Sequence, residues 1–244
     1  MGAHPAFTRI ILLSAAWLAG CGPMLPDRPT GPIPAGRPEA PLVGGLVDRP
    51  LDAGTRGAIL RESADLGRCM AELTAARVDF SPRPDRIDSG ACQQIQAGLL
   101  GADMGTVARM NPARPEMTCR LALALSVWRR QSLEPAAREI LGSDVVQIDH
   151  FGAYACRNVN NGVGSTRISA HAQAAALDVA GVRLRDGRRI TLTDDWQGDD
   201  AEARFLRRIR DDACRIFGTV LSPDYNAVHH DHLHLEATDT RFCR

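Results

Sequence analysis

Four of the seven histidines of this 244-residue chain stand in one short segment near the C-terminus, HHDHLHLE. In an extended strand alternate side chains share a face, so we expect His232, His234 and Glu236 on an accessible surface and the two intervening leucines in the core. Imidazole nitrogens on one surface can transfer protons or bind a transition metal. We expect His229 and His230 to be exposed loop residues rather than ligands, and Glu236 to support a ligand from behind.

A second candidate group lies in the segment SAHAQAAALDVAG, where His171 precedes an apolar strand that Asp178 interrupts. A carboxylate in such a place needs a partner, because burying an unpaired charge is costly. One suitable partner is zinc, which binds imidazole nitrogen and carboxylate oxygen at about 2.0–2.2 Å and in catalytic sites commonly keeps one position for water. Two histidines and Asp178 would supply the protein ligands. The alternative is an ordinary hydrogen-bonded pair between His171 and Asp178.

Hydrophobic periodicity indicates the elements that must position these groups. Apolar residues over 60–76 recur at helical spacing, and a short strand-like piece, Val78–Asp79–Phe80, follows. Further helices are predicted over 118–130, 135–141 and 200–217, and strands over 144–148, 175–184, 189–192 and 232–236, with a hairpin turn at Asp186-Gly187. Helices come first and short strands dominate later, which favours an α+β fold over a doubly wound sheet.

Six short motifs occur in order between residues 154 and 244. They are Tyr154-Ala-Cys-Arg157-Asn158, Ser169-Ala-His171, Leu177-Asp178, Pro223-Asp-Tyr-Asn226, Asp231-His-Leu-His234 and Cys243-Arg244. Together they resemble the extensin-like C-terminal domain family of bacteria, and the resemblance covers roughly residues 65–244. The His-x6-Asp spacing followed by His-x-His is also similar to that of the LAS-type zinc metallopeptidases, which include D-Ala-D-Ala carboxypeptidases and dipeptidases and share the hedgehog-like fold. The resemblance implies a small antiparallel sheet that bears the zinc site and is flanked by helices.

The same resemblance implies a Zn²⁺ ion held by His171, Asp178 and His234. Asp231 lies where the dipeptidases carry a glutamate base. Arg157 lies in a place similar to that of the arginine with which these peptidases stabilise the transition state.

Other motif residues receive roles that leave alternatives open. His232 shares the ligand face and would stabilise the oxyanion or orient the attacking water. Arg157, Tyr154 and Ser169 are candidate substrate contacts, although an ion pair for Arg157 and a structural role for Tyr154 are alternatives. Asp231 is the candidate base, and its alternative role is that of a carboxylate that fixes an imidazole tautomer.

Two departures from the peptidase pattern concern geometry. Ala174 replaces a glycine between the first two ligands, and the base is an aspartate, which is one methylene shorter than glutamate. Asp231 and His234 also fall on opposite faces of an ideal strand. A turn or bulge is therefore needed between His230 and His232 if both residues serve one site.

The seven cysteines divide into one and six. Cys21 ends the sequence Leu-Ala-Gly-Cys, which resembles a bacterial lipobox, and the six others are an even number, as expected for disulfides in an exported protein. The disulfide candidates are Cys69, Cys92, Cys119, Cys156, Cys214 and Cys243. Spacing does not determine the pairing, although Cys69 with Cys92 is the most local pair.

The N-terminal part predicts export. Residues 1–20 have the layout of a secretory signal, whose apolar run is too short to cross a bilayer. Residues 21–57 contain the lipidated Cys21 and a Pro/Gly-rich tether, and residues 58–244 would form the peptidase domain. We therefore expect a lipoprotein that faces the periplasm, anchored in the outer membrane; a plain signal peptide with a cysteine near the cut is the alternative.

Composition excludes other partners. The 29 basic residues balance the 29 acidic ones, so no net field favours nucleic acid. Aromatic residues make up 5% of the chain, which argues against a carbohydrate-stacking module. We expect a monomeric zinc peptidase that hydrolyses peptidoglycan stem peptides or cross-links and reaches the membrane through its lipid anchor. The rivals are a non-catalytic wall-binding lipoprotein with a structural zinc site, and an envelope scaffold whose histidines bind no metal.

Overall fold

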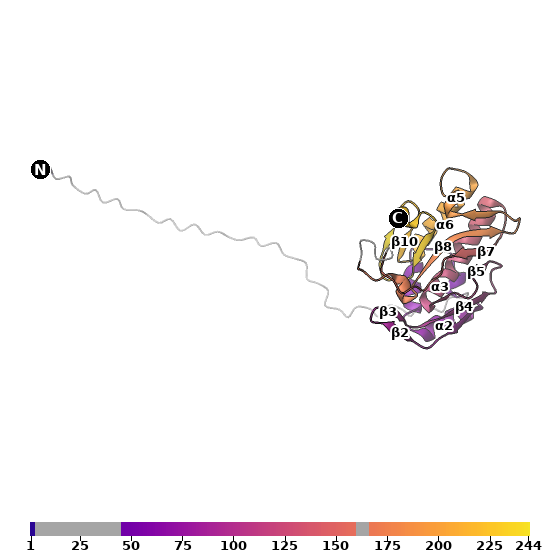
Figure 1. Cartoon of the computed structure of the whole chain (residues 1–244), viewed down its shortest axis with the longest axis horizontal. Coiled ribbons are helices and arrows are strands. Elements are labelled where there is room, and N and C mark those ends of the chain that lie inside the picture. Colours follow the sequence, from indigo (N-terminus) through magenta and orange to yellow (C-terminus); the bar gives the residue numbers. More distant parts are fainter. Residues whose placement is uncertain (3–44, 160–165) are drawn as a thin grey trace, which may run out of the picture. The chain divides into compact units, whose positions relative to one another are not determined.

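The computed structural model describes residues 1–2, 45–159 and 166–244 (Figure 1). The described residues from 45 onward belong to one unit, Pro41–Arg244. All but the first two residues of the expected signal peptide, the lipidated cysteine and the first part of the expected tether lie outside the described residues. Among the residues that are described, no helix has the length and apolar character needed to span a bilayer.

The helices and strands follow one another in mixed order. The α-helices are α1 (Thr55–Glu62), α2 (Leu66–Ala75), α3 (Cys119–Trp128), α4 (Glu134–Ala136), α5 (Leu192–Asp195) and α6 (Ala201–Ile216). Short 3-10 helices are η1 (Leu46–Asp48), η5 (Ala170–Gln173) and η6 (Ala227–His229), and π-helical turns are η2 (Arg129–Leu133) and η3 (Ala137–Leu141). The strands are β1 (Val78–Pro82), β2 (Arg86–Ser89), β3 (Cys92–Gln94), β4 (Ala97–Asp103), β5 (Arg109–Asn111), β6 (Glu116–Thr118), β7 (Val145–His150), β8 (Ala176–Leu184), β9 (Arg189–Thr191), β10 (Thr219–Leu221), β11 (Leu233–Glu236) and β12 (Phe242–Cys243).

The main sheet is mixed and, within the described residues, has seven strands. Its order is β12-β10-β11-β8-β7-β5, and β9 also pairs with β8. Strand β8 pairs antiparallel with β11, β7 and β9, whereas β5 with β7 and β10 with β12 are parallel pairs. The predicted α+β class is confirmed. The expected small antiparallel sheet is wrong in detail, because the sheet is larger and parallel toward both ends of its strand order.

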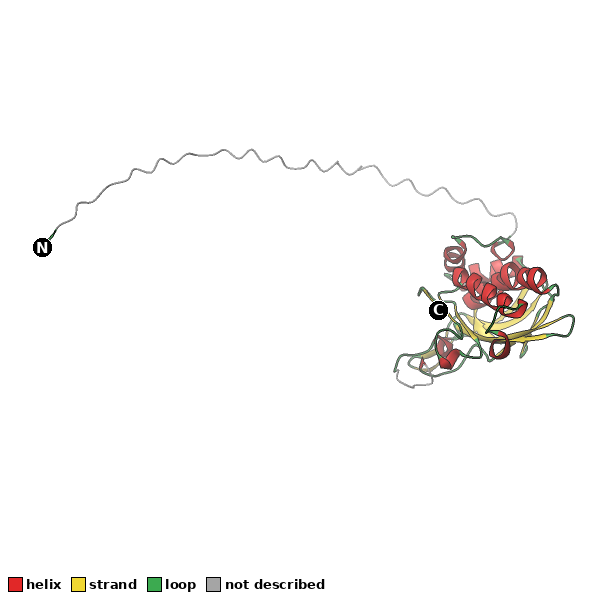
Figure 2. Ribbon diagram, turned by 90° about the horizontal axis from the view of Figure 1, so that it is seen from above, coloured by secondary structure: helices red, strands yellow, loops and turns green. Residues whose placement is uncertain are grey.

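The longer helices pack on one face of the main sheet (Figure 2). Helix α3 is buried on nearly all sides, with only Arg120 outside the core, so it forms the centre of the hydrophobic core. Helix α6 is amphipathic: Leu206 and Ile209 are buried, and arginines occupy much of its outer face. The Trp128 indole of α3 donates a hydrogen bond to the Ile209 carbonyl of α6 at 3.0 Å. This leaves the opposite face of the sheet available for a site.

Three disulfides pair the six predicted cysteines. Cys69–Cys119 joins α2 to the start of α3, Cys92–Cys156 joins β3 to the segment after β7, and Cys214–Cys243 joins α6 to β12. The local pair Cys69 with Cys92 is therefore wrong: Cys69 faces Cys119 across the contact between α2 and α3. Disulfides of this kind indicate an oxidising compartment.

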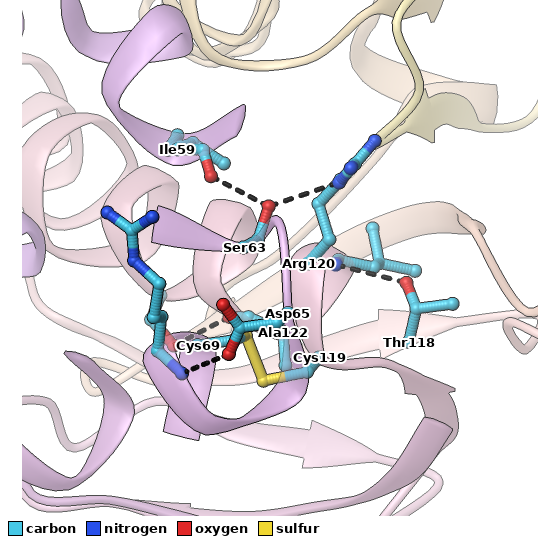
Figure 3. The surroundings of a disulfide bond; sticks show 11 residues. Ile59, Ser63, Asp65, Cys69, Thr118, Cys119, Arg120 and Ala122 are labelled. Atoms are coloured by element: carbon cyan, nitrogen blue, oxygen red, sulfur yellow. Dashed lines mark hydrogen bonds between the residues drawn. A yellow bond between two sulfur atoms is a disulfide. The ribbon is translucent and has the colours of Figure 1, made fainter. Parts of the chain in front are cut away.

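The surroundings of the first disulfide explain where its two helices begin (Figure 3). The Asp65 carboxylate accepts a hydrogen bond from the backbone N–H of Arg68 at 2.9 Å and caps α2. The Thr118 hydroxyl accepts one from the backbone N–H of Leu121 at 3.2 Å and caps α3. The single helix predicted over 60–76 is consequently two helices, because the Asp65 cap starts a new one.

Two further differences from the predicted organisation lie in the N-terminal half. The short strands β2–β6 were not predicted; β2, for example, is exposed along its whole length and has no hydrophobic alternation. The folded unit also begins before the expected boundary at residue 58. Leu46 and Val47 are buried in the core, and α1 begins at Thr55.

Candidate metal centre

Strands β8 and β11 bring two of the predicted ligands together. In their antiparallel pairing His234 lies opposite Asp178. Leu233 and Leu235 are fully buried in the hydrophobic core, as predicted. Asp178 and His234 therefore lie on the sheet face that the long helices leave open. The expected accessible surface for His232 and His234 is wrong, because both side chains are buried as well, with 8% and 6% of their surface exposed.

His171 reaches the same point through η5, the turn of helix that directly precedes β8. The Ser169 hydroxyl accepts a hydrogen bond from the backbone N–H of His171 at 3.3 Å and caps this helix. At its other end Ala174 has φ 52°, in the left-handed region, and leads the chain into β8. This is the position where the peptidase pattern has glycine, which adopts that conformation without the steric cost that alanine pays.

The three donor groups converge on one point. His171 Nε2 lies 3.1 Å from Asp178 Oδ2 and 3.2 Å from His234 Nδ1, and His234 Nδ1 lies 2.8 Å from Asp178 Oδ1. Ligand atoms around a tetrahedral zinc ion with bonds of about 2.0–2.1 Å are separated by about 3.3 Å. All three side chains are buried, with 2–7% of their surface exposed. The donor set therefore fits a metal ion with little rearrangement.

The second nitrogen of each imidazole is held from behind. His171 Nδ1 lies 3.2 Å from the Ala153 carbonyl oxygen, and His234 Nε2 lies 2.9 Å from Glu236 Oε1. Metal-ligating histidines characteristically donate their other N–H to a carbonyl or carboxylate, which sets the tautomer and the ring orientation. The supporting role predicted for Glu236 agrees with this contact.

In the metal-free cluster the charged side chains shift one another's pKa values. Burial alone would raise the pKa of Asp178, but the hydrogen bonds and positive charge of His171 and His234 hold that pKa well below its usual range. Burial lowers the pKa of His234, whereas its contacts with Asp178 and Glu236 outweigh burial and raise it to about 9. The His234 ring is therefore protonated at neutral pH until a metal displaces the proton.

His232 and Asp231 form a pair beside this cluster. Residues 230–231 make a turn before β11 begins, which resolves the parity conflict as the sequence required. Asp231 Oδ1 lies 2.7 Å from His232 Nδ1, and His232 Nε2 lies 3.5 Å from Asp178 Oδ1. A carboxylate that accepts from Nδ1–H leaves Nε2 as the nitrogen that can take up a proton. This geometry corresponds to the alternative role for Asp231, that of a carboxylate that fixes an imidazole tautomer.

The prediction that His229 is an exposed loop residue is wrong, whereas His230 is exposed as predicted. His229 ends η6 and is 7% exposed, with its ring centroid 5.1 Å from that of His232. Its Nδ1 donates to Asn226 Oδ1 at 2.7 Å, so Nε2 carries the free lone pair. Burial, followed by the positive charge of His232 and His234, lowers its pKa to about 4.

His229, His232 and His234 also form a second group whose ligand atoms lie within 4.8 Å of one another. No local sequence signal indicated the burial of His229. Asn226 has the residue type of a helix cap and favours the short helix η6, but a cap does not determine which way the ring of a residue three positions later points.

The three predicted substrate contacts are not brought to one place. Arg157 lines the cleft, with one guanidinium nitrogen 3.8 Å from Asp178 Oδ2, and Ser169 lines it while capping η5. Tyr154 does not line this cleft. Its hydroxyl donates to Asp88, and the Arg86 guanidinium lies 5.5 Å from the centre of its ring, which corresponds to the structural alternative.

The histidine cluster lies in a cleft of about 790 Å³. Phe151, Tyr225, Val228 and Phe242 are partly exposed hydrophobic residues along its walls. A second cavity of about 390 Å³ shares two of the lining residues, Gln173 and Thr238. The two cavities are therefore neighbours that meet at these side chains.

The fold and the site define an α+β protein with a buried histidine and aspartate cluster that can bind a metal ion. The chain matches the family model described as extensin-like protein C-terminus over residues 67–244, and it belongs to this family. Neither a curated protein nor a solved structure matches the chain.

Proposed function

We propose that this protein is a zinc-dependent peptidase that hydrolyses stem peptides or cross-links of peptidoglycan. The observation that carries the proposal is the convergence of His171 Nε2, His234 Nδ1 and the Asp178 carboxylate on one point, with the other nitrogen of both rings anchored. Three protein ligands leave one position open, as in catalytic zinc sites. The resemblance to the LAS-type peptidases supports the same reaction.

The side chains around the cluster have complementary roles in peptide hydrolysis. Zinc, when bound, would polarise the scissile carbonyl and make a water molecule nucleophilic at neutral pH. His232 accepts a proton from the attacking water at Nε2 and transfers it to the leaving amine. Asp231 holds the Nδ1–H of that ring and stabilises the imidazolium that forms. Arg157, in the cleft wall, stabilises the oxyanion as negative charge develops.

The shape of the site supports an extended substrate. The main cleft and the second cavity meet at Gln173 and Thr238, so a chain bound at the cluster has room to continue past these residues. The three disulfides indicate an oxidising compartment, where peptidoglycan peptides are the peptide substrates an anchored enzyme meets. Anchoring through Cys21 at the outer membrane is part of this proposal.

The test is cleavage of defined muropeptides. We expect purified protein loaded with zinc to release products that mass spectrometry identifies, and a chelator to abolish their release. His171→Ala and Asp178→Asn each remove a ligand and should lower the rate by more than about 100-fold, since even changes behind metal ligands cost 10–100-fold. His230→Ala is the matched control, because His230 belongs to the same histidine segment but is exposed. Cleavage that survives both ligand substitutions would refute the proposal.

One observation favours a second candidate, a non-catalytic envelope protein with structural zinc. His229 and His232 stand beside His234, so imidazoles are available to fill the coordination shell. Substitution with Co²⁺ separates the candidates, because absorption spectra distinguish a shell of protein ligands alone from one with exchangeable water. A closed shell together with intact muropeptides would support the structural role. The scaffold rival requires that the purified protein contain no stoichiometric metal.

A further inference from the structure

Three arginines form a row across the main sheet. The strand registers place Arg109 of β5 opposite Gln147 of β7, Gln147 opposite Arg183 of β8, and Arg183 opposite Arg189 of β9. Neighbouring strands lie about 4.8 Å apart, so the row from Arg109 to Arg189 spans about 14 Å. We call Arg109, Arg183 and Arg189 the arginine row.

The arginine row faces away from the core. The neighbouring row of paired residues on the same four strands is buried. It consists of Met110, Ile148, Val182 and Ile190, which are 0–7% exposed and point to the other face of the sheet. All three arginines of the row are exposed. The period-2 alternation of a strand therefore directs the arginines away from the core. The longer helices pack on the other face of the sheet (Figure 2).

The arginine row and the metal centre occupy the same face of the sheet. On β8 the side chains in the core are Leu177, Val179, Val182 and Leu184. The core positions therefore change from odd to even numbers between Val179 and Val182. The register with β7 shifts at the same place, which identifies a bulge at Ala180. The bulge adds one residue to β8, so Asp178 before it and Arg183 after it point to the same side of the sheet although one number is even and the other odd. They are five residues apart on β8, or about 15 Å.

The positive charge of the row is poorly compensated. Within the part of the chain that the structure describes, Arg109 and Arg183 have no ion pair. Arg189 has Asp149 at 3.4 Å, and two neutral side chains, Asn111 and Gln147, also donate to that carboxylate. Like charges directly opposite on neighbouring strands destabilise a sheet. The fold therefore holds a local excess of positive charge in a chain whose net charge is zero.

We propose that the arginine row binds carboxylates of the peptidoglycan stem peptides and anchors the polymer on the face that bears the metal centre. The inference rests on the proposed function for the identity of the polymer. Guanidinium groups bind carboxylates through paired hydrogen bonds, and exposed arginines without a partner are free to do so. The separation of about 15 Å from Asp178 corresponds to four or five extended residues. The row therefore holds substrate at a distance from the bond that reacts.

The test measures binding without cleavage. The full-length protein is sedimented with purified peptidoglycan sacculi in the presence of a chelator, as wild type and as the double variant Arg109→Gln/Arg183→Gln. We expect at least a fivefold loss of affinity in the variant, and a weaker dependence on salt concentration, because charged contacts are removed. The control Arg68→Gln/Arg204→Gln removes the same charge from helices α2 and α6 and should bind like the wild type. Thermal melting establishes that both variants are folded.

Two further arms identify the anion. In the first arm the carboxyl groups of the sacculi are amidated. The wild type should then bind these sacculi as weakly as the Arg109→Gln/Arg183→Gln variant binds untreated sacculi. Vesicles with anionic lipids should not distinguish the variant from the control. Equal binding of both double variants to sacculi, undiminished binding after amidation, or a defect seen only with vesicles would overturn the proposal. Failure of the peptidase proposal is distinguishable, since it would leave this binding intact while no muropeptide is cleaved.

Discussion

At the scale of single residues, the contacts behind the rings distinguish the histidines from one another. His171 and His234 use one nitrogen at the shared point and anchor the other on Ala153 and Glu236. His150, also buried, has both nitrogens engaged by backbone groups, Pro112 O at 2.8 Å and Gly152 N at 3.0 Å. His150 is therefore a structural histidine, although its residue type is the same.

The pKa of His234 predicts how metal uptake depends on pH. Its metal-free pKa is about 9, so the ring is protonated at pH 7 and zinc must displace that proton. We expect the apparent zinc affinity to rise about tenfold per pH unit up to about pH 9 and then level off. Titration calorimetry at pH 7 in buffers of different ionisation enthalpy should report a proton released from this ring. Zinc binding that releases no proton would contradict this protonation state.

The same pKa shift affects the stability of the metal-free protein. Because the folded-state pKa of His234 lies above the usual value of about 6.5, its stabilising contribution is fully present below that pH and is lost as pH rises through about 9. The depressed pKa of Asp178 acts in the other direction, and its contribution is lost as pH falls below the usual range of carboxylates.

The contact between Asp231 and His232 predicts a shared catalytic role. We expect Asp231→Asn and His232→Ala each to lower kcat by about 10²-fold or more while the zinc content stays the same, because one orients the group that the other supplies. The double variant should be little worse than either single one. An active His232→Ala variant beside an inactive Asp231→Asn variant would instead make Asp231 itself the base.

At the scale of elements, the turn between η5 and β8 decides whether His171 reaches the site. Ala174 occupies the left-handed region at φ 52° and is fully buried, and its carbonyl accepts from the backbone N–H of Thr118 at 2.9 Å. Alanine is thus an unfavourable residue for the backbone conformation that this turn requires. The hydrogen bond to Thr118, together with the β8–β11 pairing that follows, holds the turn in place.

This strain is testable with two alanines of the same turn. Ala174→Gly removes a conformational cost of about 1–2 kcal/mol, but it loses a buried methyl group worth about 0.8 kcal/mol and gives the unfolded chain about 0.5–1 kcal/mol of backbone entropy, so we expect the free energy of unfolding to change little. Ala172→Gly, in η5 itself, loses a buried methyl and gains backbone entropy in the unfolded chain, and should be destabilised by about 1.5–2 kcal/mol. Denaturant unfolding of both variants measures the difference. Equal destabilisation would mean that Ala174 is unstrained.

At the scale of the whole molecule, the disulfides connect elements that are distant in the chain. Cys69–Cys119 closes a loop with a sequence separation of 50 between α2 and α3, at the centre of the core. Cys92–Cys156 fastens to β3 the segment that carries Arg157, a residue of the cleft wall. The first bridge therefore stabilises the core, whereas the second holds part of the cleft in place.

We expect the double variant Cys69→Ala/Cys119→Ala to lose about 2–4 kcal/mol of unfolding free energy, because the unfolded chain gains the freedom that the bridge removes. The measurement is denaturant unfolding under non-reducing conditions. Cys21→Ala is the control, since Cys21 takes part in none of the three bridges. A double variant as stable as the control would show that packing alone holds α2 against α3.

The sequence alone determined what depends on local pattern. Alternation in HHDHLHLE predicted that Leu233 and Leu235 enter the core, because a strand has a period of two, and the need for a turn before β11 followed from the same rule. It did not predict that His232 and His234 are buried too. The motif spacing, through its resemblance to zinc peptidases, also selected the group His171, Asp178 and His234, which the fold brings together.

Tertiary structure decided everything that depends on pairing between distant segments. The partner of Cys69, the burial of His229, the placement of Tyr154 against Asp88 and the alignment of the arginine row all depend on which strands and helices lie side by side. No local propensity encodes those neighbours, because a residue's spacing along the chain does not specify which distant element will pack against it. A β-bulge at Ala180 even reverses the parity that a regular strand would have predicted for Arg183.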